Sequence, residues 1–397
     1  MAKLKTIVQS SKLIATGYIF TIILLFFYSF TQVDLGLTLT RHPVFLPYQK
    51  FFQYIGYFNR PLSTYLFVAI FFFLLVFYFL ILRFTYQKKV MSSLFWKIIL
   101  LTSAILLFSY NAFSYDLFNY IFDAKIITYY GQNPYQHKAL DYPQDPMLSF
   151  MHWTHRLYPY GPIWLLITVP FSYIGLQFFL PTFLLFKLLI IGSFIGTVHY
   201  IEKISQKLFP SDSMFNTIFF ALNPLVIIES LVSAHNDIVM MFFAMMATYL
   251  LIEKKYALSF LVLLLSVGIK FSTLFLVPIF LYVLILNYKK KSVDWERIFL
   301  LESIVMIIAV IFSSARTELQ PWYFLWVVPF AAFISRKKLL FIPTSIFSFI
   351  LLAYYVPFLY SGNWDPPIPS IKNWLLIFGM LFSGYLIIFP RTKKEKV

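Results

Sequence analysis

The chain has 397 residues, of which 60% are hydrophobic and only 12% are charged, whereas soluble domains carry about 25% charged residues. This composition excludes an ordinary soluble enzyme and predicts an all-α, polytopic membrane protein. The formal net charge of +16 would suggest a nucleic-acid partner in a soluble protein, but here the basic residues lie between apolar runs, so we expect a lipid bilayer and no nucleic acid. The absence of cysteine excludes disulfides, thiolate metal sites and a cysteine nucleophile.

Apolar runs predict about 12 transmembrane helices within a single unit that covers residues 1–397. The first run follows Lys3, Lys5 and Lys12 but has no small-residue cleavage site, so we interpret it as a retained helix rather than a signal peptide. The predicted spans lie near 13–31, 62–83, 96–113, 181–199, 213–230, 237–252, 256–270, 272–288, 298–314, 322–335, 339–358 and 371–389.

The apolar segment 161–175 is an exception because it is short and contains Pro170. As a helix it would be about 22 Å long, whereas the bilayer core is ~30 Å thick. Basic residues beyond 199 divide between alternate loops as 15 against 3. The larger set is Lys203, Lys207, Lys254, Lys255, Lys289, Lys290, Lys291, Arg297, Arg336, Lys337, Lys338, Arg391, Lys393, Lys394 and Lys396, and the smaller set is Lys270, Arg316 and Lys372.

Cytoplasmic loops are enriched in lysine and arginine. The basic residues near the N-terminus and at 83–97 share the side of the larger set only if 161–175 does not cross. We therefore expect a multi-pass cell-membrane protein with both termini in the cytoplasm, and a segment 161–175 that lies in the outer leaflet. The residues 114–180 then form a large extracytoplasmic loop with interfacial helices inside it.

Polar residues gather on this outer side. Asp116 directly follows the third predicted span, and Asn119 and Asp123 come one and two helical turns later. A carboxylate at the mouth of a transmembrane helix is costly unless it faces water or a substrate, so Asp116 is a candidate functional residue. The alternative is a helix end that meets lipid headgroups.

A second cluster, His235, Asn236 and Asp237, opens another apolar helix. Asp237 could simply complement the positive end of that helix, but an adjacent histidine and asparagine are more polarity than a cap needs. We interpret all three as substrate-binding candidates.

A third cluster is basic and aromatic. It contains Lys270, Arg316, Gln320 and Trp322, and Tyr160 is a further candidate in the first loop. Lys270 could instead snorkel to the headgroups, and Arg316 could pair with Glu318. Cations are scarce on this side beyond residue 199, so each is a candidate to meet an anionic group. No histidine spacing indicates a metal site, and we expect neither a metal nor another cofactor.

Sugar transfer from a lipid-phosphate donor needs a base for the acceptor hydroxyl and cations for the departing phosphate. The outer carboxylates and cations supply both. The same residues would also serve a transporter or flippase of a lipid-linked sugar, although the sequence shows no inverted repeat and little glycine.

The order of several short motifs resembles the GT-C superfamily of integral membrane glycosyltransferases, in particular the bacterial polyprenol-phosphate-mannose-dependent mannosyltransferases. The matching stretches span residues 110–325 and are Tyr115-Asp116, 130–135, Tyr160-Gly-Pro162, Asn223-Pro-Leu, His235-Asn-Asp237 and Gln320-Pro-Trp-Tyr323. The resemblance implies that Asp116 is the first-loop catalytic aspartate and Asp237 the second-loop acidic residue. It also implies jaw-like helices in the first loop, which agrees with a segment 161–175 that does not cross.

Together these observations predict a glycosyltransferase that moves a hexose, expected to be mannose, from a polyprenyl-phosphate donor to an extracytoplasmic glycan or glycolipid acceptor. Asp116 is the expected general base, and a single base predicts inversion at the anomeric carbon. Lys270 and Arg316 are expected to hold the donor phosphate. The residues expected to line the sugar and acceptor site are His235, Asn236, Asp237, Gln320, Trp322 and Tyr160. No role is assigned to Lys187, Glu229 or Glu302.

Overall fold

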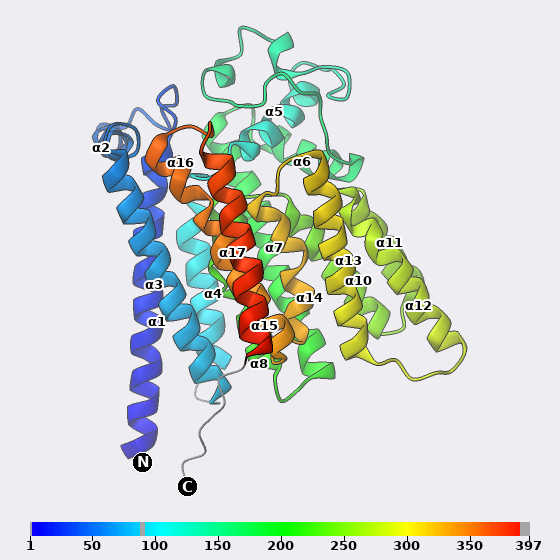
Figure 1. Cartoon of the computed structure of the whole chain (residues 1–397). Helices are drawn as coiled ribbons and strands as arrows, with labels where there is room; N and C mark the ends of the chain where they lie inside the picture. Colours follow the sequence, from blue (N-terminus) through cyan, green and yellow to red (C-terminus); the bar gives the residue numbers. More distant parts are fainter. Residues whose placement is uncertain (1, 88–91, 390–397) are drawn as a thin grey trace.

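The computed structural model describes residues 2–87 and 92–389, and every regular element within these ranges is a helix (Figure 1). The α-helices are α1 (Ala2–Ser29), α2 (Phe45–Phe58), α3 (Arg60–Tyr86), α4 (Ser92–Leu107), α5 (Asp116–Thr128), α6 (Pro162–Ile174), α7 (Phe179–Leu208), α8 (Ser213–Ala221), α9 (Pro224–Ile227), α10 (Asp237–Ile252), α11 (Tyr256–Val267), α12 (Val277–Tyr288), α13 (Trp295–Arg316), α14 (Val328–Phe333), α15 (Lys338–Ala353), α16 (Tyr355–Ser361) and α17 (Ile368–Ile388). Short helical turns include η4 (Ile228–Val232), η5 (Phe271–Leu276) and η6 (Pro321–Trp326).

The long helices form one bundle, and each predicted span corresponds to a helix or to a broken helix in it (Figure 1). Within the described ranges, 7 helices are long and apolar enough to cross a membrane, and a pair bent by 51° between α8 and α9–η4 raises this to 8. The chain is therefore a polytopic membrane protein. Because α4, α10 and α11 are shorter apolar helices, the count of about 12 crossings remains a prediction.

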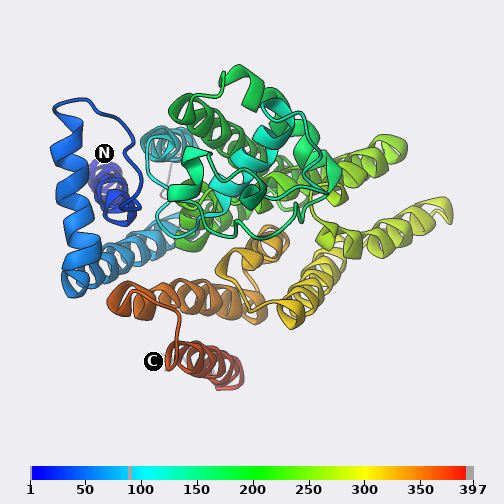
Figure 2. The same ribbon diagram turned by 90° about the horizontal axis from the view of Figure 1, so that it is seen from above.

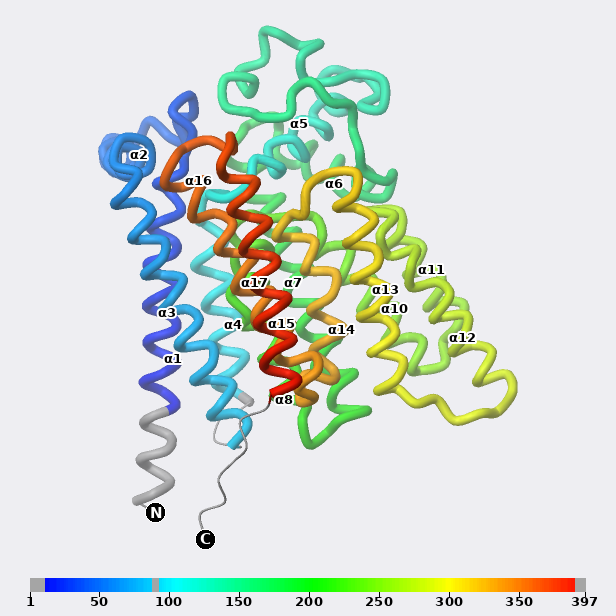
Figure 3. The backbone as a smooth tube through the Cα atoms, in the orientation of Figure 1, coloured from blue at the N-terminus to red at the C-terminus, as the bar shows by residue number. Residues whose placement is uncertain are grey.

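The two ends of the bundle differ. Helix α1 begins and α17 ends at one end, whereas α2, α5 and α6 lie at the other (Figure 3). The turns at 253–255 and 289–294 lie at the end where α1 begins (Figure 1). This arrangement agrees with the grouping of basic residues, although which end faces the cytoplasm remains a prediction. The basic residues at 88–89 and 391–396 lie outside the described residues.

Helix α2 was not predicted. It lies across the end of the bundle beside α1 and α3 (Figure 2). Its buried side carries Gln49 and Gln53, whose amide groups donate to Leu37 O at 2.7 Å and Asp34 O at 2.9 Å. Its exposed side includes the aromatic residues Phe51, Tyr54 and Phe58. Glutamines bonded inward and aromatic rings directed outward are typical of a helix that lies in the membrane interface.

Helix α6 corresponds to the predicted non-crossing segment. Its 13 residues extend about 20 Å, less than the ~30 Å bilayer core. The chain at its start is joined to the end of α11, since Gly161 N donates to Ile269 O at 3.0 Å and Ile163 N to Gly268 O at 2.9 Å. A Cβ on Gly161 would lie 2.1 Å from Gly268 O, so this close approach requires glycine. This contact between the start of α6 and the end of α11 brings Tyr160 beside Lys270.

Candidate active site

Asp116 is the first residue of α5, at the end of the bundle that carries the large loop (Figure 1). Its backbone N–H donates to Ser114 Oγ at 3.1 Å, which fixes the start of the helix. Its carboxylate meets groups from three parts of the chain. His235 Nδ1 lies 3.6 Å from Oδ2, Arg156 Nη2 lies 3.7 Å from Oδ1, and the Tyr120 hydroxyl donates to Oδ2 at 3.4 Å.

Burial by itself raises the pKa of Asp116, but its basic neighbours more than offset this effect. The close approach and charge of His235, followed by the charges of Arg156 and Lys270, lower the Asp116 pKa to about 2. In the absence of substrate, Asp116 is therefore an ionised carboxylate at neutral pH. Its side chain is 11% exposed, so it can be reached from outside.

His235 lies in the turn between η4 and α10 and is fully buried. Its Nε2 lies 3.3 Å from Glu229 Oε2, and its ring stacks on Trp322 with centroids 4.1 Å apart. Burial by itself lowers the pKa of His235, but Asp116 and Glu229 have a larger effect in the opposite direction. The pKa of His235 is therefore raised to about 9. The structure thus places the His235 ring between two acidic side chains, within ion-pair distance of each. The Tyr355 hydroxyl donates to the other Glu229 oxygen at 2.9 Å.

The turn that carries His235 is held by a buried lysine. Lys187, on α7, is fully buried, and its Nζ donates to Leu231 O at 2.6 Å and to Ser109 Oγ at 2.9 Å. Carbonyl groups in the last turn of a helix have no partner within the helix. The Lys187 amino group therefore donates to a carbonyl group that the π-helical turn η4 leaves without a partner. Ala234 then adopts a left-handed conformation with φ of 58°, after which His235 points back toward Glu229 and Asp116. Lys187 therefore acts as a structural support for the site.

Asp237, at the start of α10, holds a second cation. Its Oδ2 accepts a hydrogen bond from Lys270 Nζ at 2.7 Å, and its Oδ1 accepts one from Trp326 Nε1 at 2.6 Å. Asp237 is fully buried, whereas the Lys270 side chain is 15% exposed and lies over the Tyr160 ring at 5.5 Å. Asp237 therefore positions Lys270, and Lys270 is the member of the pair that an external anion can meet.

The structure brings together most of the predicted site. The Tyr120 hydroxyl donates to Asn236 Oδ1 at 3.3 Å as well as to Asp116, so the second predicted cluster joins the first. The predicted residues that converge are Asp116, Tyr160, His235, Asn236, Asp237, Lys270 and Trp322.

Two predicted residues stand apart from these contacts. Arg316 is exposed at the end of α13 and has no ion-pair partner in residues 2–87 and 92–389. Its neighbour Glu318 pairs with Lys372 at 2.6 Å instead. Gln320 precedes η6 and makes no side-chain cap there. The assignment of both to substrate stays a prediction, and the geometry favours Arg156 over Arg316 for an anion near Asp116.

Sequence reasoning missed four residues of the site. Arg156 was not predicted, although it lies four residues before Tyr160 and its guanidinium approaches that hydroxyl at 3.4 Å. Trp326 lies four residues after Trp322, a spacing that one helical face would have suggested. Glu229 and Tyr120 gave no such signal, because their partners are distant in sequence. In the described part of the chain, no group of three histidine or acidic residues could hold a metal ion, and the absence of a cofactor remains a prediction.

A family model described as alpha-(1->6)-mannopyranosyltransferase, N-terminal domain, matches residues 20–286. The chain belongs to this mannosyltransferase family. The resemblance stated from the motifs is thereby confirmed, and the chain is a membrane glycosyltransferase. The matched range contains Asp116, Arg156, His235, Asp237 and Lys270, whereas Trp322 lies beyond it. No curated protein and no solved structure matches the chain.

Proposed function

We propose that this glycosyltransferase moves a mannosyl group from a polyprenyl-phosphate donor to the hydroxyl of an extracytoplasmic glycan or glycolipid, with inversion at the anomeric carbon. The observation that carries the proposal is the convergence of Asp116, Arg156 and Lys270 at one end of a membrane bundle. A carboxylate that can be reached from outside, with two cations beside it, is what transfer from a phosphate leaving group requires.

Asp116 is the base in this proposal because Asp237 and Glu229, the two other carboxylates that contact the converging residues, are occupied. Asp237 is fully buried and bonded to Lys270 and Trp326. Glu229 is also fully buried, between His235 and Tyr355. Of these three carboxylates, only Asp116 is partly exposed, at 11% of its side chain. Attack assisted by a single base is a direct displacement, which inverts the anomeric carbon.

The leaving phosphate is assigned to Arg156 and Lys270. Their side chains are 32% and 15% exposed, so both can bind an incoming phosphate without opening the core. Arginine presents a planar fork that matches phosphate oxygens, and lysine adds a compact charge. Stabilisation of the departing phosphate by such groups typically contributes ~10²–10³ in rate for each.

Donor binding would also tune the base. A carboxylate with a pKa of about 2 is a weak proton acceptor, and it is the positive charge of His235, Arg156 and Lys270 that holds the pKa so low. When Arg156 and Lys270 engage the negatively charged donor, their effect on Asp116 is partly cancelled. The Asp116 pKa then rises toward the range in which a general base works.

In the proposed step, the acceptor oxygen attacks the anomeric carbon of the donor from the face opposite the phosphate. The bond between that carbon and the phosphate oxygen breaks, and its electron pair stays on polyprenyl phosphate. The acceptor proton passes to Asp116. The products are an inverted glycoside and polyprenyl phosphate, which remains in the membrane.

The transporter alternative uses the same aqueous face, but the family match is to a transferase, which favours the enzyme. The test uses the full chain in lipid nanodiscs with labelled polyprenyl-phosphate mannose and a mannose-terminated acceptor. We expect a new glycosidic bond whose configuration is opposite to that of the donor. Transfer from a nucleotide sugar but not from the lipid donor, or retention of configuration, would contradict the proposal.

A further inference from the structure

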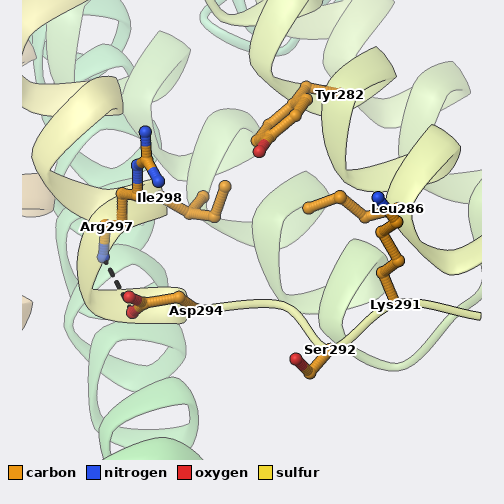
Figure 4. Close-up of a pocket in the computed structure, with 7 residues that line it drawn as sticks. All are labelled: Tyr282, Leu286, Lys291, Ser292, Asp294, Arg297 and Ile298. Carbon is orange, nitrogen blue, oxygen red and sulfur yellow. Dashed lines mark hydrogen bonds between the residues drawn. The ribbon is translucent and has the colours of Figure 1, made fainter.

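A cavity of about 420 Å³ lies far from Asp116, where α12 and α13 are joined by the turn 289–294 (Figure 4). It sits at the end of the bundle where α1 begins (Figure 1). Ligand sites typically occupy ~300–1,000 Å³, so the space is large enough for a small polar group with part of an apolar tail.

Three of the seven lining residues are apolar or aromatic and belong to membrane helices, and the other four are polar or charged. Tyr282 and Leu286 extend from α12 toward Ile298 of α13 (Figure 4). Both helices are candidate spans, Phe271–Tyr288 and Trp295–Arg316. The cavity therefore begins within the apolar layer and opens at the turn, which is the level where acyl chains meet headgroups.

The mouth of the cavity is basic. It carries Lys291 and Arg297, and neither charged group has an ion-pair partner in the described part of the chain. Asp294 also lines it, but its carboxylate caps α13 by accepting from Arg297 N at 3.1 Å. Two free cations against one engaged carboxylate leave a net positive site.

A neighbouring cavity of about 180 Å³ provides a contrast, because Arg297 borders it as well. There Lys337 is already paired with Glu296. Of the two cavities, only the larger one is therefore lined by a lysine without an ion-pair partner in the described residues.

The backbone holds Lys291 in place. Lys291 N donates to Leu286 O at 2.9 Å and Lys290 N to Asn287 O at 3.0 Å, the bonding pattern that ends a helix in a Schellman motif. Lys290 occupies the left-handed position of that motif, with φ of 53°, where glycine is usually found. The motif folds Lys291 back over the last turn of α12, next to Leu286, as Figure 4 shows.

We propose that this cavity binds the phosphodiester headgroup of an anionic phospholipid from the adjacent leaflet. Lys291 contacts the phosphate, Arg297 on the opposite side of the cavity adds positive charge, and the acyl chains run along Tyr282, Leu286 and Ile298. Basic pockets between transmembrane helices have the chemistry that anionic headgroups require. The apolar wall distinguishes a lipid from free phosphate, and the net positive mouth distinguishes an anionic from a zwitterionic lipid. The site is independent of the proposed transfer reaction.

The test measures lipid binding to the detergent-purified, delipidated full chain by native mass spectrometry. The probes are phosphatidylglycerol, phosphatidylcholine and inorganic phosphate as a competitor. The variants are Lys291→Gln, which changes only a side chain in a surface turn, and the double variant Lys291→Gln with Arg297→Gln. The control is Lys255→Gln, an exposed lysine at the same end that does not line the cavity.

At about 1 kcal/mol for each basic residue near the surface, the affinity for phosphatidylglycerol should fall about fivefold in the single variant and about 30-fold in the double variant. Lys255→Gln should bind as the wild type does, phosphatidylcholine should bind weakly to every form, and millimolar phosphate should not displace the lipid. Equal lipid affinity in wild type and Lys291→Gln would overturn the proposal. So would phosphatidylcholine binding as tight as that of phosphatidylglycerol, or displacement by phosphate, which would mark a site for soluble anions.

Discussion

The charge of His235 is the property of the site that can be tested most quantitatively. Asp116 and Glu229 raise its pKa from 6.5 to about 9 despite burial. At 1.36 kcal/mol for each pH unit, this rise corresponds to roughly 3 kcal/mol of stabilisation of the imidazolium. Because the folded-state pKa lies above the unfolded value, this contribution to stability is fully present below pH 6.5 and is lost as pH rises through 9.

Trp322 provides the assay, since its ring stacks on His235 at 4.1 Å and a protonated imidazole quenches indole fluorescence. The difference in fluorescence between wild type and His235→Gln should increase in a step centred near pH 9. The apparent unfolding temperature of the wild type should fall between pH 6.5 and about 9. In Glu229→Gln, which removes one of the two carboxylates, the fluorescence step should move to lower pH. A wild-type step near pH 6.5, or pH traces that His235→Gln leaves unchanged, would refute the reasoning.

Three further predictions follow from the site and the bundle. Lys270→Met should destabilise the protein by about 3–5 kcal/mol, because it leaves the buried Asp237 without its cation. In a thermal unfolding assay, adding Asp237→Asn should recover much of this loss, and additive losses of stability in the double variant would contradict the pairing. In steady-state kinetics, Arg156→Gln should weaken polyprenyl-phosphate binding or slow transfer by ~10²-fold. Arg316→Gln should change either quantity by less than about threefold, and an effect equal to that of Arg156→Gln would support binding of the donor phosphate by Arg316. A cysteine introduced at Gln144 should react with an impermeant thiol reagent on intact cells and one at Lys290 should not, and labelling at Lys290 would reverse the predicted orientation.

The sequence predicted the parts of the fold that depend on composition along the chain. Long apolar runs predicted helices where the bundle has them, and the charge asymmetry predicted that 161–175 does not cross, with which the short length of α6 is consistent. The convergence of Asp116, His235, Asp237 and Lys270 was also predicted, because residues that follow or precede spans on one side must lie at the same end of the bundle.

What the sequence did not predict depends on tertiary contacts. Helix α2 was missed because its glutamines are buried and bonded to backbone while its aromatic rings are exposed, which is the reverse of the usual pattern. Glu229 lies inside an apolar run, so the sequence does not show that it faces His235. That contact depends on the 51° bend between α8 and α9–η4 and on the π-helical turn that contains Glu229. Arg156 was not assigned because its position beside Asp116 is set by an irregular loop that has no periodic signal.

The most direct test of the account is the replacement Asp116→Asn, which keeps the shape of the side chain but removes the basic carboxylate. The purified variant and wild type would be compared for binding of polyprenyl-phosphate mannose and for its transfer to an acceptor, with Asp141→Asn in the same outer loop as the matched control. We expect Asp116→Asn to bind the donor within a fewfold of wild type and to transfer about 10²–10⁴-fold more slowly, while Asp141→Asn transfers normally. Transfer by Asp116→Asn at the wild-type rate would contradict the role of Asp116 as the base.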